Sequence, residues 1–215
     1  MSALFERWRP QTLDELKGFE TVKQQILQVQ ASVGLMGQSF YITGQSGTGK
    51  TTIARILANA ASDPTCIEEV DGADVNVDTI REWEKQSQSR PLFGSGFAYI
   101  INEAHTMRSP VVSRMNTTLE SPGIQRNALF LFTTTADGNK HLFDTKFDAL
   151  PFLSRCLHLK LELDVDTVHQ MADHLCHICE TEGFATGTKD EFVEQLQETS
   201  FNLRSCIQSL PMRVA

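Results

Sequence analysis

The stretch GQSGTGKT at residues 44–51 constrains the fold of this 215-residue chain more than any other feature. It fits the pattern G-x-x-x-x-G-K-[ST] and lies between an apolar run and an amphipathic segment, as a loop between a strand and a helix would. Such glycines let backbone N–H groups surround phosphate oxygens, and the following helix adds its positive dipole end. The alternative is a glycine-rich turn without a ligand. We predict a phosphate-binding loop formed by Gly44, Gln45, Ser46, Gly47, Thr48, Gly49, Lys50, Thr51 and Thr52.

Short apolar runs alternate with amphipathic segments over most of the chain. Strands that alternate with helices predict an α/β fold, a mostly parallel sheet with helices on both faces. Ser109 and Pro110 are expected to cap one helix and to occupy its first position. The expected strands are residues 40–43, 66–70, 97–101, 128–132 and 156–161, and the expected helices are 51–61, 78–88 and 111–119.

The pattern changes after Leu161, where apolar residues recur at helical spacing. Helices are expected at residues 165–179, 190–196 and 203–212. We therefore predict two domains, a nucleotide-binding core at residues 1–162 and a small helical lid at residues 163–215.

The apolar strand at residues 97–101 runs into Asn102 and Glu103, where ATP-hydrolysing proteins are expected to have Asp-Glu. Lys50 would reach the outer phosphates of ATP, Thr51 and Asn102 would position Mg²⁺, and Glu103 would orient the attacking water. An amide at position 102 replaces a charge-assisted hydrogen bond of ~1.5–3 kcal/mol by a neutral one of ~0.5–1.5 kcal/mol. This predicts a slow ATPase, and the alternative is a site that only binds nucleotide.

Composition limits the function classes that fit. The formal charge of -8 argues against nucleic-acid binding by bulk charge alone. The apolar runs are far shorter than the ~18 residues of a membrane helix. The N-terminal residues Glu6, Arg7 and Arg9 are charged where a signal peptide is apolar, so the five cysteines are expected to be reduced and the protein cytoplasmic.

Taken in order, several motifs resemble the clamp-loader ATPases of the AAA+ superfamily, particularly the bacterial DNA polymerase III tau/gamma subunit and the small replication factor C subunits. The segment WRPQTLDELKGFETVKQQI at residues 8–26 resembles the family's adenine-wrapping segment, and INEAHTM and SRMNTTLESP follow the loop as in the family. LFTTTA, SRC and FNLRSCIQSL then match the sensor 1, arginine-finger and sensor 2 motifs.

The resemblance implies roles for individual residues. Trp8, Arg9 and Pro10 would contact the nucleotide, and Thr134 would be sensor 1. Arg155 would complete the ATP site of a neighbouring subunit, and Arg204 would contact ATP in its own subunit. The alternative for both arginines is a surface side chain that pairs with a carboxylate.

The resemblance also implies partners: a homo- or hetero-oligomer, DNA, a sliding clamp or other replication protein, and no membrane. The chain departs from the family pattern in three ways. Asn102 replaces Asp, only Cys66 lies near the region of the family's zinc-binding cysteine quartet, and the helical collar that follows the lid in the family is expected to be missing.

Four basic residues are candidates for contact with DNA phosphates. Arg81 and Lys85 stand at i and i+4 of a predicted helix, where like charges repel by a few tenths of a kcal/mol, ~0.2–0.5. Arg81 resembles a basic position that faces DNA in the family, and Arg108 and Arg114 would extend the stripe. The alternative is a solvated helix face.

The segment DHLCHIC at residues 173–179 offers metal-ligand types, but helical spacing points them in several directions, so a zinc site is not favoured. Cys156 and Cys206 are expected to pack in the core. The leading hypothesis is a clamp-loader-like AAA+ ATPase that couples ATP binding and hydrolysis to assembly on DNA. The alternatives are a low-activity stator subunit and an AAA+ helicase loader or recombination ATPase.

Overall fold

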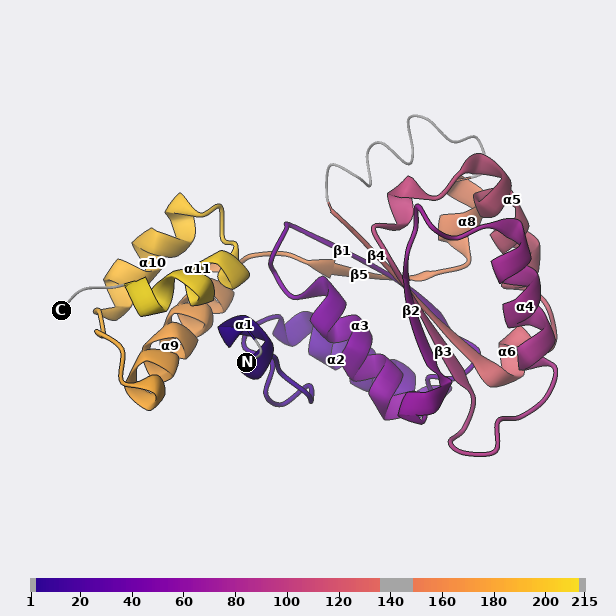
Figure 1. Cartoon of the computed structure of the whole chain (residues 1–215), viewed down its shortest axis with the longest axis horizontal. Helices are drawn as coiled ribbons and strands as arrows, with labels where there is room; N and C mark the ends of the chain where they lie inside the picture. Colours follow the sequence, from indigo (N-terminus) through magenta and orange to yellow (C-terminus); the bar gives the residue numbers. More distant parts are fainter. Residues whose placement is uncertain (1–2, 136–148, 213–215) are drawn as a thin grey trace.

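The computed structural model describes residues 3–135 and 149–212, and five strands of these residues form one sheet (Figure 1). The neighbouring pairs are all parallel, in the order β2-β3-β4-β1-β5. The predicted α/β fold is thus confirmed, with strand ends shifted by a few residues. The strands are β1 (Ser39–Gly44), β2 (Ile67–Asp71), β3 (Phe97–Asn102), β4 (Ala128–Thr135) and β5 (Leu157–Leu161).

Helices cover both faces of the sheet (Figure 1). Successive side chains of a strand point to opposite faces, so Tyr99 and Ile100 of β3 belong to different cores. One core contains residues of α2 (Glu20–Ser32) and α3 (Lys50–Ala61). The other contains residues of α4 (Val77–Ser87), α5 (Ser109–Thr118), α6 (Ile124–Asn127) and α8 (Ala149–Ser154). Burial on both faces explains the apolar runs of β1, β3 and β4.

The expected cap of α5 is wrong. Arg108, not Ser109, has the extended backbone of a capping residue, and its carbonyl oxygen accepts from the N–H groups of Val111 and Val112 at 2.9 and 3.1 Å. Ser109 is therefore the first helical residue, and no side chain caps this end. Pro110 still fits because the first turn of a helix does not need its N–H group.

Three helices follow β5 and lie together at one end of the molecule (Figure 1). These are α9 (Val165–Glu182), α10 (Lys189–Glu198) and α11 (Leu203–Ser209), close to the expected ranges. A 3-10 turn, Leu210–Met212, ends α11 early, where Pro211 supplies no N–H group. Their buried side chains continue the core under α2 and α3. A domain boundary at residues 162/163 remains our proposal, and residues 213–215 lie outside the described part.

The N-terminal segment spans the length of α9. At the end of α1 (Leu4–Arg7), Arg7 and Trp8 each donate a hydrogen bond of 2.8 Å to the carboxylate of Glu182, the last residue of α9. At the start of α9, Thr167 Oγ1 accepts a hydrogen bond of 3.2 Å from the Phe19 N–H group. Gly18 has a φ of +79°, and a Cβ atom there would lie 2.6 Å from Thr167 Cγ2. The segment therefore fixes this lid helix beside the core at both ends.

No helix in residues 3–135 or 149–212 combines the length and the apolar character needed to cross a bilayer.

Candidate functional site

The predicted phosphate loop connects β1 to α3, as expected. Lys50 begins α3, is only 6% exposed, and donates from Nζ to the Gln45 carbonyl at 2.7 Å. Burial lowers the pKa of the Lys50 amine below its ordinary value, Arg204 acts in the same direction, and Glu103 opposes both. The loop thus holds a desolvated cation within electrostatic range of two further predicted site residues.

The loop contacts the lid where it has no side chain. Gly47 has a φ of +77°, and a Cβ atom there would lie 1.9 Å from Asn202 Oδ1. Asn202 precedes α11 and caps it by accepting from the Ser205 N–H group at 3.1 Å. Glycine at position 47 is therefore required both by the turn and by the helix that bears Arg204.

Asn102 lies at the carboxyl end of β3, beside the predicted Mg²⁺ ligand. Its Oδ1 accepts from Thr51 Oγ1 and from Thr133 Oγ1, each at 3.0 Å. Its Nδ2 donates to Glu69 Oε1 at 2.7 Å. Two hydroxyl donors at Oδ1 and a carboxylate acceptor at Nδ2 are consistent with a single orientation of the amide. The predicted pair of Thr51 and Asn102 is thus brought together.

Glu103 directly follows and has a left-handed backbone, with φ +48° and ψ +49°. Its carboxylate Oε2 lies 3.5 Å from His105 Nδ1, and that nitrogen lies 2.8 Å from Thr134 Oγ1. A non-glycine residue in this conformation is uncommon. The geometry links the predicted base to the predicted sensor through His105, which the sequence reasoning did not single out. Ala136, which ends the LFTTTA motif, lies outside the described residues.

A cleft opens between the loop, the N-terminal segment and the lid. Gly47, Thr48, Gly49 and Thr52 line it, and so do the other predicted nucleotide contacts, Trp8, Arg9, Pro10 and Arg204. Arg204 Cζ lies 5.4 Å from the centre of the Phe5 ring. The cleft also includes residues outside the quoted motifs, among them Phe5 and Met171.

The histidines of the DHLCHIC segment flank Trp8. The ring centres of His174 and His177 lie 6.0 and 5.6 Å from that of Trp8, both in edge-on geometry. Cys179 is fully buried in the core. In the described part of the chain, no group of three or more His, Cys, Asp and Glu side chains is arranged to hold a metal ion. His174 is part of the cleft wall.

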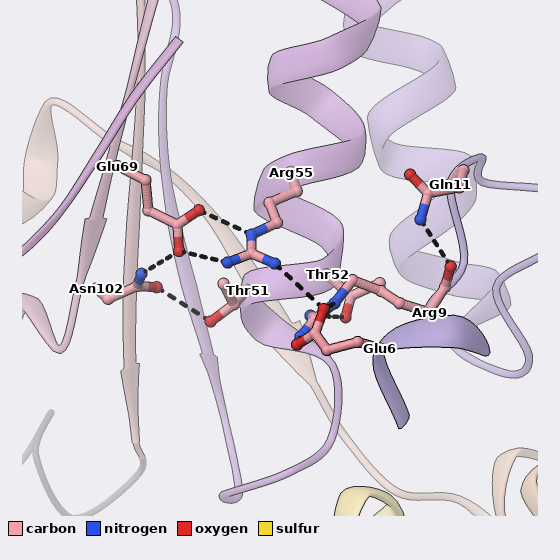
Figure 2. Close-up of polar contacts among 8 residues, drawn as sticks. All are labelled: Glu6, Arg9, Gln11, Thr51, Thr52, Arg55, Glu69 and Asn102. Atoms are coloured by element: carbon pink, nitrogen blue, oxygen red, sulfur yellow. Dashed lines mark hydrogen bonds and ion pairs between the residues drawn. The ribbon is translucent and has the colours of Figure 1, made fainter. Parts of the chain in front are cut away.

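A polar network extends from Asn102 to the N-terminal segment (Figure 2). The Glu69 carboxylate accepts from Arg55 Nε at 2.7 Å and from Nη2 at 3.1 Å. Arg55 Nη1 lies 3.8 Å from Glu6, and Glu6 pairs with Arg9. Burial raises the pKa of Glu69, but the hydrogen bonds from Arg55 and Asn102 outweigh it and hold this pKa below its ordinary value. The network keeps an ionised carboxylate against the Asn102 amide.

Arg9 is the last residue of this network and contacts both Glu6 and the phosphate loop. Its Nη1 donates to Thr52 Oγ1 at 2.9 Å (Figure 2). The sequence reasoning placed Arg9 and Thr52 at the nucleotide but missed Glu6, Arg55 and Glu69. One signal was present, because Arg55 follows Thr51 by four residues and therefore shares its helix face.

Arg155 pairs within its own chain. Its Nη2 lies 2.7 Å from Glu120 Oε1, and its Nη1 donates to the Pro151 carbonyl at 2.7 Å. This is the surface ion pair that the sequence left open as the alternative. A role across a subunit interface stays a prediction and requires this exposed pair to open.

The four candidate DNA contacts differ in their surroundings. Arg81 pairs with Asp78 at 2.7 Å, and Arg114 pairs with Glu84. Asp78 therefore offsets the expected repulsion between Arg81 and Lys85. Among residues 3–135 and 149–212, Lys85 and Arg108 are exposed and form no ion pair.

No family model matches the chain, whereas individual proteins do. It is 28% identical to DNA polymerase III subunit tau of Escherichia coli over 80% of this chain and 29% of that one. It is 27% identical to replication factor C small subunit 1 of Pyrobaculum islandicum over 98% of this chain and 61% of that one. The predicted resemblance to clamp-loader subunits is therefore confirmed, and the chain spans less than a third of the tau subunit.

Solved structures agree on the fold. The RuvB Holliday junction branch migration motor of Thermotoga maritima superposes with a TM-score of 0.68 at 21% identity, over 94% of this chain and 63% of that one. A DNA polymerase III gamma subunit-related protein of Thermotoga maritima gives 0.57 at 13% identity, over 87% and 58%. The fold is that of the AAA+ P-loop proteins, as predicted.

From the environment of His174 we predict that the free energy of unfolding decreases as the pH falls below neutral. Burial lowers its pKa to about 4, and Lys17 and His177 act in the same direction, whereas an unfolded histidine titrates near ~6.5. Between these values the unfolded chain binds a proton that the folded chain does not, so the free energy of unfolding falls as the pH falls. From pH 7.5 to 5 this component amounts to about 1–2 kcal/mol, allowing for partial exposure.

His174→Phe keeps a ring against Trp8 and should lack this component when urea unfolding is compared at the two pH values. His169→Phe, at an exposed position of the same helix, controls for the change of residue type. Equal pH dependence in the wild type and His174→Phe would contradict the assignment.

Proposed function

We propose that the chain binds Mg-ATP in this cleft and hydrolyses it slowly, as a clamp-loader-like AAA+ ATPase. The observation that carries the proposal is the convergence of Lys50, Thr51, Asn102 and Glu103 beside a cleft that also holds Trp8 and Arg204. Their carboxyl-end position matches the ligand side of parallel α/β sheets. Similarity to tau and replication factor C subunits supports the same conclusion.

The donor set fits Mg²⁺. The Thr51 hydroxyl oxygen is a hard donor that can coordinate Mg²⁺ while its hydrogen is donated to Asn102 Oδ1. Mg²⁺ takes few protein ligands because it keeps waters and phosphate oxygens. When bound, the ion would neutralise charge on the phosphates. Lys50 would contact the outer phosphates, and its desolvated position increases this attraction.

Glu103 is the residue that we assign to activating water. Its side chain is 45% exposed and stands beside His105. Among the described residues it forms no ion pair with lysine or arginine, so it can accept a proton or orient a water directly. Thr134, held against His105, would report the state of the phosphates to the same group. Arg204 would act on the nucleotide of its own subunit, and Arg155 on that of a neighbour.

We further propose that the chain acts in a homo- or hetero-oligomer that assembles on DNA and acts on a sliding clamp or another replication protein. These partners come from the similarity to clamp-loader subunits. A stator subunit of low activity is the second candidate. It is favoured by the uncharged Asn102.

Glu103→Gln tests the catalytic assignment. The variant should lose roughly 100-fold or more of the ATPase rate, since the amide cannot accept the proton, while it retains and traps bound ATP. Turnover and nucleotide retention would be measured on the same preparations, with Glu198→Gln at an exposed lid position as the control. An unchanged rate in Glu103→Gln would show that Glu103 is not the base.

Mixing of inactive chains tests whether Arg155 acts across an interface. Arg155→Ala and Lys50→Ala should each be inactive, and their mixture should recover activity where an intact loop meets an intact arginine. The specific activity of the wild type should also rise with protein concentration. Glu120→Gln, which frees Arg155 from its ion pair, should not reduce activity. If Arg155 only pairs with Glu120, both variants should reduce stability and leave the ATPase rate unchanged.

DNA binding tests the basic helix. Arg81→Ala with Lys85→Ala should weaken ATP-dependent binding of duplex DNA and flatten its salt dependence by about one unit for each phosphate that the protein no longer neutralises. ATP binding itself should persist. Lys160→Ala with Lys189→Ala removes the same charge from other surfaces and serves as the control. Tight DNA binding without nucleotide, or binding that the first pair of substitutions leaves intact, would refute this interface.

A further inference from the structure

The Asn102 amide connects the predicted metal ligand to a carboxylate on the neighbouring strand. Both acceptor positions of Oδ1 are used, by Thr51 and Thr133. One Nδ2 hydrogen is donated to Glu69 at 2.7 Å, and Figure 2 shows the contacts of Asn102 with Thr51 and Glu69. The side chain is therefore held by three residues from α3, β4 and β2. These three contacts restrict which type of side chain fits at position 102.

An aspartate at position 102 would not fit beside Glu69. In the same geometry, a carboxylate oxygen would replace Nδ2 and meet Glu69 Oε1 at the 2.7 Å now spanned by a hydrogen bond. Two carboxylates in contact repel, and one of them must take up a proton or move away. Asparagine is therefore the residue type that Glu69 requires at this position.

Arg55 keeps Glu69 in place and ionised. It donates two hydrogen bonds to the carboxylate from α3, one helical turn beyond Thr51. A carboxylate that accepts from Nδ2 polarises the amide and makes Oδ1 a stronger acceptor, as in other hydrogen-bond chains. The Asn102 oxygen beside Thr51 is thus more negative than that of an isolated amide.

We propose that Glu69 supplies the negative charge of the metal site and acts through Asn102, so that the two residues together replace a single carboxylate at position 102. Glu69 is a positioning residue in this scheme, because it touches Asn102 and not the nucleotide. The inference rests on the proposed binding of Mg-ATP. It explains why an amide at position 102 is compatible with a functional site.

A purely structural role is the competing explanation. The ion pair of Glu69 with Arg55 also ties β2 to α3, and its loss would reduce stability whatever the metal does. The two explanations differ in one respect. Only the proposed role depends on which of positions 69 and 102 carries the carboxylate.

A double-mutant cycle distinguishes the proposed role of Glu69 from a purely structural one. Asn102→Asp combined with Glu69→Gln exchanges the two groups, since the amide introduced at position 69 can accept from Arg55 and donate to the new carboxylate. Mn²⁺ bound in the presence of ADP would be counted by electron paramagnetic resonance, and urea unfolding without metal would measure stability. Glu68→Gln is the matched control, because the neighbouring glutamate accepts from Trp83 on the opposite side of the sheet.

Glu69→Gln should weaken Mn²⁺ binding roughly fivefold, the effect of turning a charge-assisted into a neutral hydrogen bond. Adding Asn102→Asp should restore it. Asn102→Asp alone should destabilise the metal-free protein, and adding Glu69→Gln should remove that loss. Glu68→Gln should leave metal binding unchanged.

Unchanged Mn²⁺ binding in Glu69→Gln, or a double variant no better than Glu69→Gln, would overturn the inference while leaving the proposed function intact. ADP binding without metal, compared between the wild type and Lys50→Ala, tests the proposed function separately. If the wild type binds no nucleotide, both proposals fail.

Discussion

The structure depends on the close approach of the phosphate loop to its neighbours at the end of β1. Gly44 would place a Cβ atom 2.9 Å from Leu161 Cβ, and Gly47 would place one 1.9 Å from Asn202. Because β1 lies between β4 and β5, the loop that leaves it meets both the last strand of the sheet and the lid. The absence of two side chains thus lets core and lid share one cleft.

Sequence patterns predicted the features that depend on interactions between residues close in the chain. The loop, the strands and the lid helices followed from the glycine spacing and from apolar periodicity. The proximity of Thr51 to Asn102 followed from the role of both motifs in positioning Mg²⁺. The cap of α5 was misassigned by one residue because Ser109 and Arg108 can both precede a proline-containing first turn. Sequence preference there is weaker than the carbonyl geometry that the fold imposes.

The polar network could not be predicted, because it depends on register and on long sequence separations. Glu69 reaches Asn102 across the β2–β3 pair, 33 positions along the chain, and Trp8 reaches Glu182 across 174. Neither pair has a spacing that a helix or strand pattern would reveal. For the same reason Asn102 looked like a weakened aspartate when read alone, whereas its environment makes it part of a charged pair.

The contacts of the N-terminal segment with both ends of α9 have a consequence for folding during synthesis. Phe19 and Thr167 are separated by 148 positions, so the N-terminal segment is synthesised well before the helix that it contacts. At typical elongation speeds this delay is roughly 7–30 s. The parallel sheet can pair during that interval, but the cleft gains its wall only after α9 is complete. Ligand binding can therefore assist only the last stage of folding.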